Sequence, residues 1–225
     1  MPLDVSRIKG LCFDVDGTLN DTDDQWVQRF GRILRPVRAL LPGRDENRFA
    51  RECLMAAETP ANFFYRLADD LHLDDDLLRI LNHRSSHSLR RPASYLIIPG
   101  ILETLERLSK LYPMAVVSAR DERTTLAFLD QYGLTGRFVC VVTSQTCEYT
   151  KPYPHPVLYA AQQMGLPPEN CLMIGDTTVD IKAGRRAGGQ TAGVLCGFGR
   201  EKELRVAGAD VILQTTCHIE QVLLS

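Results

Sequence analysis

The sequence predicts an α/β fold, in which a mostly parallel, doubly wound (Rossmann-like) sheet forms a three-layer sandwich with helices and carries an inserted α-helical domain. Three observations support this prediction. Short apolar runs rich in β-branched residues alternate with segments of helical periodicity, and this alternation is typical of a parallel sheet covered on both faces. A long stretch after the first run contains no strand pattern. The 225 residues suffice for one such sheet with a large insertion.

The predicted core alternates strands and helices along the chain. Six apolar runs have the length and composition of buried strands. These runs are residues 8–13, 114–117, 138–142, 171–174, 191–195 and 209–213. Four segments between them place apolar residues at helical spacing. These segments are residues 101–111, 123–132, 156–164 and 179–187. We therefore assign residues 1–20 and 93–225 to an α/β catalytic core.

Residues 21–92 form the predicted helical insertion. Apolar residues recur there at helical spacing in three places, around Trp26, Phe63 and Leu77. The segment contains 12 arginines and no lysine, and four of the arginines, at positions 29, 32, 35 and 38, fall on one side of a helix. Two interpretations remain open at this point. The arginines form a solvated helix face, or one or two of them bind a distal anion of a substrate.

Composition and charge exclude several classes of protein. The net charge of −2, from 26 basic and 28 acidic residues, gives no basic field over the whole chain, so we expect no nucleic-acid partner. No apolar run approaches the length of a membrane span, and the first ten residues lack the apolar core of a secretion signal. The seven cysteines form no C-x-x-C pair and are odd in number. Reduced thiols and a cytoplasmic location are therefore expected.

Two acidic residues mark the end of the first predicted strand. Asp14 and Asp16 alternate with apolar residues and precede a turn at Gly17, so both side chains leave the strand on the same face. Ligands of open parallel sheets bind at the carboxyl ends of the strands. Two carboxylates this close repel each other, which implies a bound cation, a shared proton or separate roles for the two groups.

A second acidic pair follows the predicted strand at residues 171–174. Asp176 stands at the end of that strand, and Asp180 lies four residues later in the first turn of the next helix. If the two strands are neighbours, three or four carboxylates converge at one edge of the sheet. Such a cluster of oxygen ligands without sulfur suits Mg²⁺. The alternative is that Asp176 and Asp180 only cap the helix.

Two further residues suit a phosphate group. Ser118 ends another predicted strand, where its hydroxyl and the following backbone N–H groups could hold a phosphoryl oxygen. Lys151 precedes Pro152, which restricts the backbone around it. A positioned ammonium group near several carboxylates would neutralise charge and bind a phosphate. Each residue alone is equally compatible with a turn or a surface position.

Together these motifs resemble the haloacid dehalogenase-like hydrolase superfamily. The order is Asp14-x-Asp16-Gly17-Thr18, then Ser118, then Lys151-Pro152, then Gly175-Asp176 with Asp180. The resemblance covers residues 8–213. The helical insertion after the first motif is similar to the cap domain of phosphoglycolate phosphatases and β-phosphoglucomutases.

The resemblance implies a role for each acid of the site. Asp14 would attack phosphorus and form an aspartyl-phosphate. Asp16 would protonate the leaving oxygen and then activate water. The carboxylates of Asp14 and Asp176 and the backbone carbonyl of Asp16 would hold Mg²⁺, and Asp180 would bind the ion or orient its waters.

The resemblance also implies which residues hold the substrate. Ser118, the Ala119 N–H and Lys151 would hold the transferring phosphoryl oxygens. Gly17 and Arg120 are further candidate substrate contacts. Arg120 stands near the position where relatives often carry an asparagine, and it could substitute for that residue. Candidate contacts from the cap, which would close over the core and exclude water, are Arg29, Arg51, Arg66 and His83.

These features predict a Mg²⁺-dependent phosphatase of a small phosphorylated metabolite, present as a monomer or homodimer. Dehalogenases of the superfamily lack the second acid of the first motif, here Asp16, and its phosphonate-cleaving members use a cap lysine that this chain lacks. Three alternatives remain: a phosphomutase of the β-phosphoglucomutase type, a signalling receiver, which would lack the cap, and a catalytically silent phosphate-binding protein.

Overall fold

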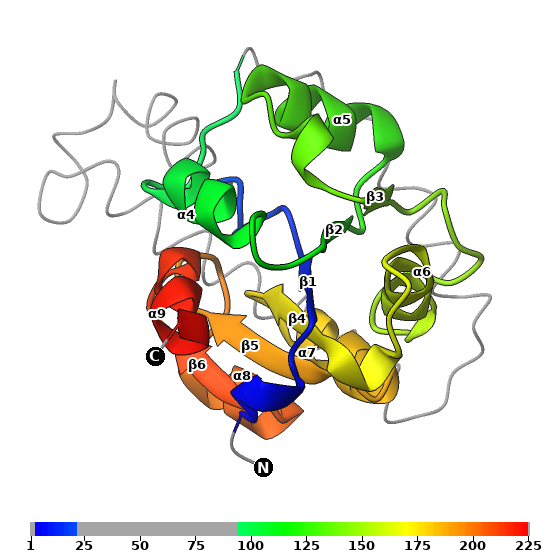
Figure 1. Cartoon of the computed structure of the whole chain (residues 1–225), viewed down its shortest axis with the longest axis vertical. Coiled ribbons are helices and arrows are strands. Elements are labelled where there is room, and N and C mark those ends of the chain that lie inside the picture. Colours follow the sequence, from blue (N-terminus) through cyan, green and yellow to red (C-terminus); the bar gives the residue numbers. More distant parts are fainter. Residues whose placement is uncertain (1–2, 22–93, 225) are drawn as a thin grey trace, which may run out of the picture. The chain divides into compact units, whose positions relative to one another are not determined.

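The computed structural model describes residues 3–21 and 94–224, so the predicted helical insertion lies outside the described residues except for Asp21. The described residues contain a six-stranded, fully parallel sheet with the strand order β3-β2-β1-β4-β5-β6 (Figure 1). The strands are β1 (Gly10–Phe13), β2 (Met114–Val117), β3 (Cys140–Val142), β4 (Cys171–Gly175), β5 (Gln190–Val194) and β6 (Val211–Leu213). The predicted doubly wound α/β fold is therefore confirmed.

Helices cover both faces of this sheet. They are α4 (Ile101–Leu108), α5 (Glu122–Gln131), α6 (His155–Gln163), α7 (Thr178–Arg186), α8 (Glu201–Ala207) and α9 (Ile219–Leu224). Side chains of α4, α5 and α9 share one apolar core with the sheet, whereas α6 and α7 form a second core on the other face. Four short 3₁₀ turns complete the described elements: Val5–Arg7, Thr135–Arg137, Pro168–Asn170 and Thr216–His218.

The central strand β1 contributes to both cores because successive side chains of a strand point to opposite faces. Leu11 and Phe13 belong to the core under α4, α5 and α9, and Cys12 belongs to the core under α6 and α7. All four residues of β1 are buried. Strands buried on both faces have continuous apolar sequences, which explains why the sequence pattern identified this strand.

The element boundaries differ from the predicted ones at several ends. The first strand begins at Gly10 and not at residue 8, because Val5–Arg7 form a 3₁₀ turn that the Ile8 N–H closes on the Val5 carbonyl (3.1 Å). Helix α4 ends at Leu108, three residues earlier than predicted, and continues as a hydrogen-bonded turn. The sequence did not indicate α8 and α9, which have only 7 and 6 residues.

The two segments that lead into and out of the insertion lie side by side in the core. The Asp21 N–H donates to the Leu96 carbonyl (3.0 Å), and the Ile98 N–H donates to the Leu19 carbonyl (2.9 Å). Asn20 lies between them and forms β-bridges to Asp16 on one side and to Ile97 on the other. The chain therefore leaves the core and returns to it at one place, directly after β1.

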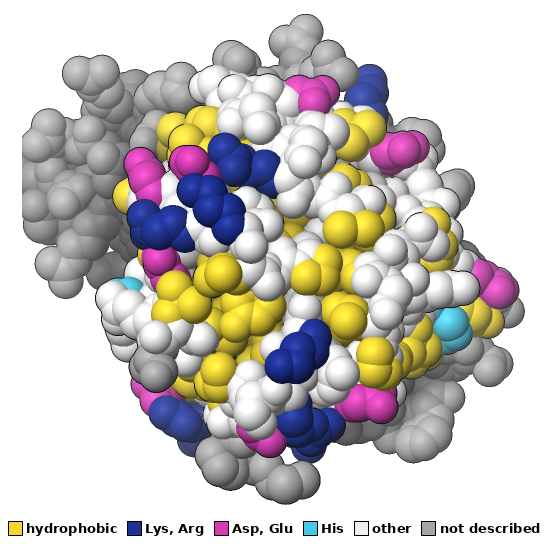
Figure 2. Space-filling model, in the orientation of Figure 1, with side chains coloured by type: hydrophobic (Ala, Val, Ile, Leu, Met, Phe, Trp, Pro, Cys, Tyr) yellow, Lys and Arg dark blue, Asp and Glu magenta, His cyan; other side chains and the backbone are white. Residues whose placement is uncertain are grey.

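Charges of both signs are interspersed on the face of the described core that Figure 2 shows. Near α4, Arg107 pairs with Glu220, and Lys110 lies 3.8 Å from Glu106. Among the helices in the described ranges, none is both long and apolar enough to cross a membrane.

Candidate functional site

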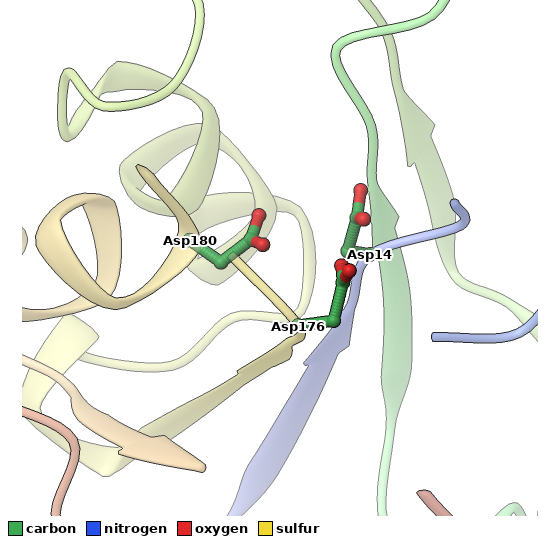
Figure 3. A group of neighbouring side chains, drawn as sticks. All are labelled: Asp14, Asp176 and Asp180. Carbon is green, nitrogen blue, oxygen red and sulfur yellow. The ribbon is translucent and has the colours of Figure 1, made fainter. Parts of the chain in front are cut away.

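Three buried aspartates meet at the carboxyl edge of the sheet. Asp14 directly follows β1, and its N–H donates to the Ile174 carbonyl of β4 (2.9 Å), so the ends of the two strands are adjacent. Asp176 directly follows β4, and Asp180 lies in the first turn of α7. Carboxylate oxygens of the three residues lie within 4.8 Å of one another (Figure 3). The structure thus brings together three of the four predicted acids.

Lys151 lies among these aspartates. Its Nζ donates to Asp14 Oδ1 and to Asp180 Oδ1, each at 2.6 Å, and its side chain is only 3% exposed. Burial opposes the positive charge, but the attraction of the two carboxylates outweighs it and raises the pKa of Lys151. The lysine is therefore a fixed positive charge, placed near the carboxylates as the sequence predicted.

For Asp14, burial outweighs the attraction of the neighbouring positive charge. Burial raises its pKa from the ordinary 3.8 to about 7, with Lys151 lowering this pKa and the charges of Asp180 and Asp16 raising it. The single ammonium group of Lys151 thus compensates the buried negative charge only in part. A second cation at this position would favour the ionised form of Asp14.

Asp180 serves both the helix and the cluster. Its Oδ2 accepts hydrogen bonds from the N–H (3.0 Å) and hydroxyl (2.5 Å) of Thr177, the N-cap residue that precedes α7, while its Oδ1 accepts from Lys151. A β-carbon at Gly175 would lie 2.4 Å from the Asp180 side chain, so this position needs glycine. Asp180 therefore caps α7 and also lies in the acidic cluster, and its role in metal binding stays a prediction.

Two loops hold Asp176 in place. Its Oδ2 accepts a hydrogen bond from the Phe198 N–H (3.0 Å). Gly17 approaches from the other side, with a φ of +70° and with space so limited that a β-carbon would lie 2.4 Å from Asp176 Oδ2. A β-carbon at Gly197 would collide as well, at 2.1 Å. Sequence reasoning missed the loop of Gly197 and Phe198, for which the closely spaced glycines after β5 were the available signal.

The turn after β2 contains the remaining predicted core residues. Ser118 is buried, and its N–H donates to the Val142 carbonyl (2.9 Å), which keeps it at the edge of the sheet where Asp14 lies. Its Oγ accepts a hydrogen bond from the Arg120 N–H (3.1 Å). Ala119 lies between the two residues in this turn. Ser118 is thus ordered beside the strand end that bears Asp14.

The Arg120 side chain binds the carboxylate of Asp16. Its Nε donates to Asp16 Oδ2 (2.5 Å), and its Nη2 donates to Asp16 Oδ1. The guanidinium also lies over the ring of Tyr95, 5.5 Å from the ring centroid. The Asp16 carboxylate is 39% exposed and is separate from the three buried aspartates. The predicted cap contacts Arg29, Arg51, Arg66 and His83 lie outside the described residues.

The fold and these residues define a parallel α/β protein with an acidic site at the carboxyl edge of its sheet. The site includes a buried lysine and is suited to bind a cation together with a phosphate. A family model described as haloacid dehalogenase-like hydrolase matches residues 11–194, and the chain belongs to this family. Family membership separates it from signalling receivers.

Similar proteins support this assignment over nearly the whole chain. The chain is 30% identical to a pyrophosphatase PpaX from Bacillus pumilus over 213 residues, 93% of each chain. It is 28% identical over 225 residues to a phosphoglycolate phosphatase from Nitrosococcus oceani, covering 95% of each. The crystal structure of a hydrolase from Pseudomonas syringae has the same fold, with a TM-score of 0.61, 24% identity and coverage of 95% of this chain and 97% of that one.

Proposed function

We propose that the protein is a Mg²⁺-dependent phosphatase that hydrolyses a small phosphorylated metabolite through an aspartyl-phosphate on Asp14. One observation carries this proposal: Asp14 ends the central strand, Lys151 holds one of its oxygens at 2.6 Å, and two further buried carboxylates lie next to it. The family membership and the phosphatases among the relatives support the same activity.

The donor set at this site fits Mg²⁺. The three buried aspartates offer only carboxylate oxygens, which are the hard ligands that this ion prefers. The residues that would hold it are Asp14, Asp176 and the backbone carbonyl of Asp16, with Asp180 as a further ligand or a partner of bound water. A bound Mg²⁺ supplies positive charge that offsets these carboxylates and the oxygens of the phosphoryl group.

Asp14 and Asp16 divide the chemistry in our proposal. Lys151 holds Asp14 Oδ1, so Oδ2 is the oxygen that attacks phosphorus. A bond forms between this oxygen and phosphorus while the bond to the leaving oxygen breaks, and Asp16 transfers its proton to that oxygen. Asp16 then accepts a proton from water, whose oxygen attacks phosphorus and releases inorganic phosphate from Asp14.

Neighbouring groups of the core hold the phosphoryl oxygens during both steps. The Ser118 hydroxyl and the Ala119 N–H lie in the turn after β2, and the Lys151 ammonium lies beside Asp14. Gly17 turns the chain next to Asp176, where a β-carbon would collide with the Asp176 carboxylate. Fixed charges and donors of this kind supply most of the catalysis in phosphoryl transfer.

The substrate class is a small phosphorylated metabolite of the phosphoglycolate type. Two of the relatives are named for the hydrolysis of phosphoglycolate and of pyrophosphate, which favours water over a sugar hydroxyl as the final acceptor of the phosphoryl group. Release of inorganic phosphate from phosphoglycolate, without a bisphosphate activator, would support hydrolysis against the mutase alternative. We place this activity in the cytoplasm.

The test uses the purified full chain with p-nitrophenyl phosphate. The wild-type protein should release p-nitrophenol with Mg²⁺, lose this activity in EDTA and regain it when Mg²⁺ is returned. Asp14→Asn should lower turnover by roughly a thousandfold or more, because the amide is a poor nucleophile. Asp130→Asn, which changes an exposed aspartate of α5, is the matched control and should keep full activity. Substantial turnover by a folded Asp14→Asn protein would refute the proposal.

A further inference from the structure

The contact between Arg120 and Asp16 joins two residues 104 positions apart at the edge of the site. Both oxygens of the Asp16 carboxylate accept a hydrogen bond from the same guanidinium. Such a bidentate pair fixes the position and the plane of both groups. Asp16 is therefore held as a carboxylate in this contact, and it serves as the proton donor to the leaving oxygen only after one of its oxygens has left Arg120 and taken up a proton.

Arg120 is itself fixed by the segment that returns from the insertion. The guanidinium lies over the Tyr95 ring, and this ring packs edge-to-face on Phe128 of α5, with 5.8 Å between the centroids. The Tyr95 carbonyl accepts hydrogen bonds from Gln131 Nε2 (2.8 Å) and from the Tyr132 hydroxyl (2.6 Å). The guanidinium of Arg120 is thus held in place before any ligand binds, so binding a ligand there would cost little side-chain conformational entropy.

One end of this guanidinium has no acceptor within the described residues. The Nε and Nη2 groups bind Asp16, whereas Nη1 is buried and has no hydrogen-bond partner within residues 3–21 and 94–224. A buried donor without an acceptor is costly, and an anionic oxygen at this position would remove that cost. Nη1 and Nη2 form a second pair of donors with the geometry of a carboxylate or phosphate.

We infer that Arg120 is a specificity-determining residue that binds an anionic group carried by the leaving group of the substrate. The inference rests on the proposed function, because only then does Asp16 mark the position of the leaving oxygen. A group that is bound to the arginine holding Asp16 must lie close to that oxygen. The substrate class is therefore a phosphate ester or anhydride with a carboxylate or a second phosphoryl group near the bridging oxygen.

The experiment compares substrates that differ in this charge alone. Phosphoglycolate and 2-hydroxyethyl phosphate share their two-carbon leaving group, but only the first carries a carboxylate. Pyrophosphate tests a phosphoryl group in place of the carboxylate. Wild-type protein, Arg120→Ala, Arg120→Gln and Arg120→Lys are assayed with Mg²⁺ for kcat and KM on all three substrates. Arg123→Ala removes the same charge from an exposed position three residues away and is the matched control.

The ratio of kcat/KM between phosphoglycolate and 2-hydroxyethyl phosphate isolates the recognition of the anion. Any effect of the substitution on Asp16 or on folding changes kcat/KM by the same factor for both substrates, so it cancels in this ratio. We expect Arg120→Ala and Arg120→Gln to lower the ratio by about 10- to 100-fold, the range of a lost hydrogen bond to a charged group. Arg120→Lys should restore part of it, and Arg123→Ala should leave it unchanged.

The outcomes separate this inference from the proposed function. An unchanged ratio in the Arg120 variants, for phosphoglycolate and for pyrophosphate alike, overturns the role of Arg120 and leaves the phosphatase activity standing. Hydrolysis of only 2-hydroxyethyl phosphate by the wild-type protein also overturns the inference alone. A wild-type protein that releases phosphate from none of the three substrates, nor from p-nitrophenyl phosphate, overturns the proposed function and the inference with it.

Discussion

Replacement of Asp14 by asparagine should stabilise the metal-free protein at alkaline pH. Asp14 is buried, and its pKa rises from 3.8 to about 7 in the folded protein because burial disfavours its charge. A raised pKa means that folding favours the neutral carboxyl. The contribution of Asp14 to stability is then fully present below pH 3.8 and is lost as the pH rises through about 7. Asparagine has nearly the same shape and carries no charge at any pH.

The size of this effect follows from the two pKa values. Between the two pKa values, Asp14 is protonated in the folded protein and ionised in the unfolded chain. In this interval the free energy of unfolding falls by about 1.4 kcal/mol for each unit of pH. Between pH 5 and pH 8, a pKa of about 7 gives a loss of roughly 2–3 kcal/mol in the wild-type protein relative to Asp14→Asn. The burial of Asp14 leaves little screening by solvent to reduce this number.

Urea unfolding, followed by circular dichroism in EDTA at several pH values, measures this difference. Asp121→Asn is the control: burial raises the pKa of Asp121, but hydrogen bonds from Thr124 and other groups outweigh burial and hold this pKa below its ordinary value, so Asp121 stays ionised between pH 5 and pH 8. Its difference from wild type should be constant between pH 5 and pH 8. If the difference in free energy of unfolding between Asp14→Asn and wild type is also constant between pH 5 and pH 8, burial does not raise the pKa of Asp14, and the reasoning is refuted.

Two further predictions concern the groups around Asp14. Lys151→Met should lower the free energy of unfolding by about 3–5 kcal/mol in EDTA at pH 8, because it leaves buried carboxylates without their cation; urea unfolding checks this, and a loss below about 1 kcal/mol would contradict it. Gly17→Ala should abolish most activity, since its β-carbon would displace Asp176. Gly133→Ala has a similar φ of +63° with nothing within 4 Å, so it should lose about 1–2 kcal/mol of stability, measured by thermal unfolding, and keep its activity.

Much of the fold could be predicted because the central strands are buried on both faces. Such strands carry continuous apolar runs, and the four residues of β2 at 114–117 match the predicted run at both ends. The short helices α8 and α9 could not be predicted in this way. Each has two turns at most, which is too few for an apolar period to stand out from the neighbouring sequence.

The buried part of the candidate site was predictable for a similar reason. Asp14 and Asp176 each follow an apolar run directly, and parallel strands bring such positions to one edge of the sheet. The pairing of Arg120 with Asp16 was not predictable, because it depends on how two loops fold over the ends of different strands. The same is true of the Phe198 N–H that holds Asp176. Loop geometry leaves no periodic signal in a sequence.

The paired segments beside β1 fix both ends of the intervening chain at one place in the core. Backbone hydrogen bonds join residue 21 to residue 96 and residue 98 to residue 19, so the chain enters and leaves the insertion through two adjacent segments of the core. A junction of this kind is modular: one segment can be exchanged for another of different length while the aspartates and the lysine keep their places. Evolution can therefore alter which molecules are accepted without rebuilding the catalytic machinery, and a chimera with a transplanted insertion would inherit the chemistry of its core.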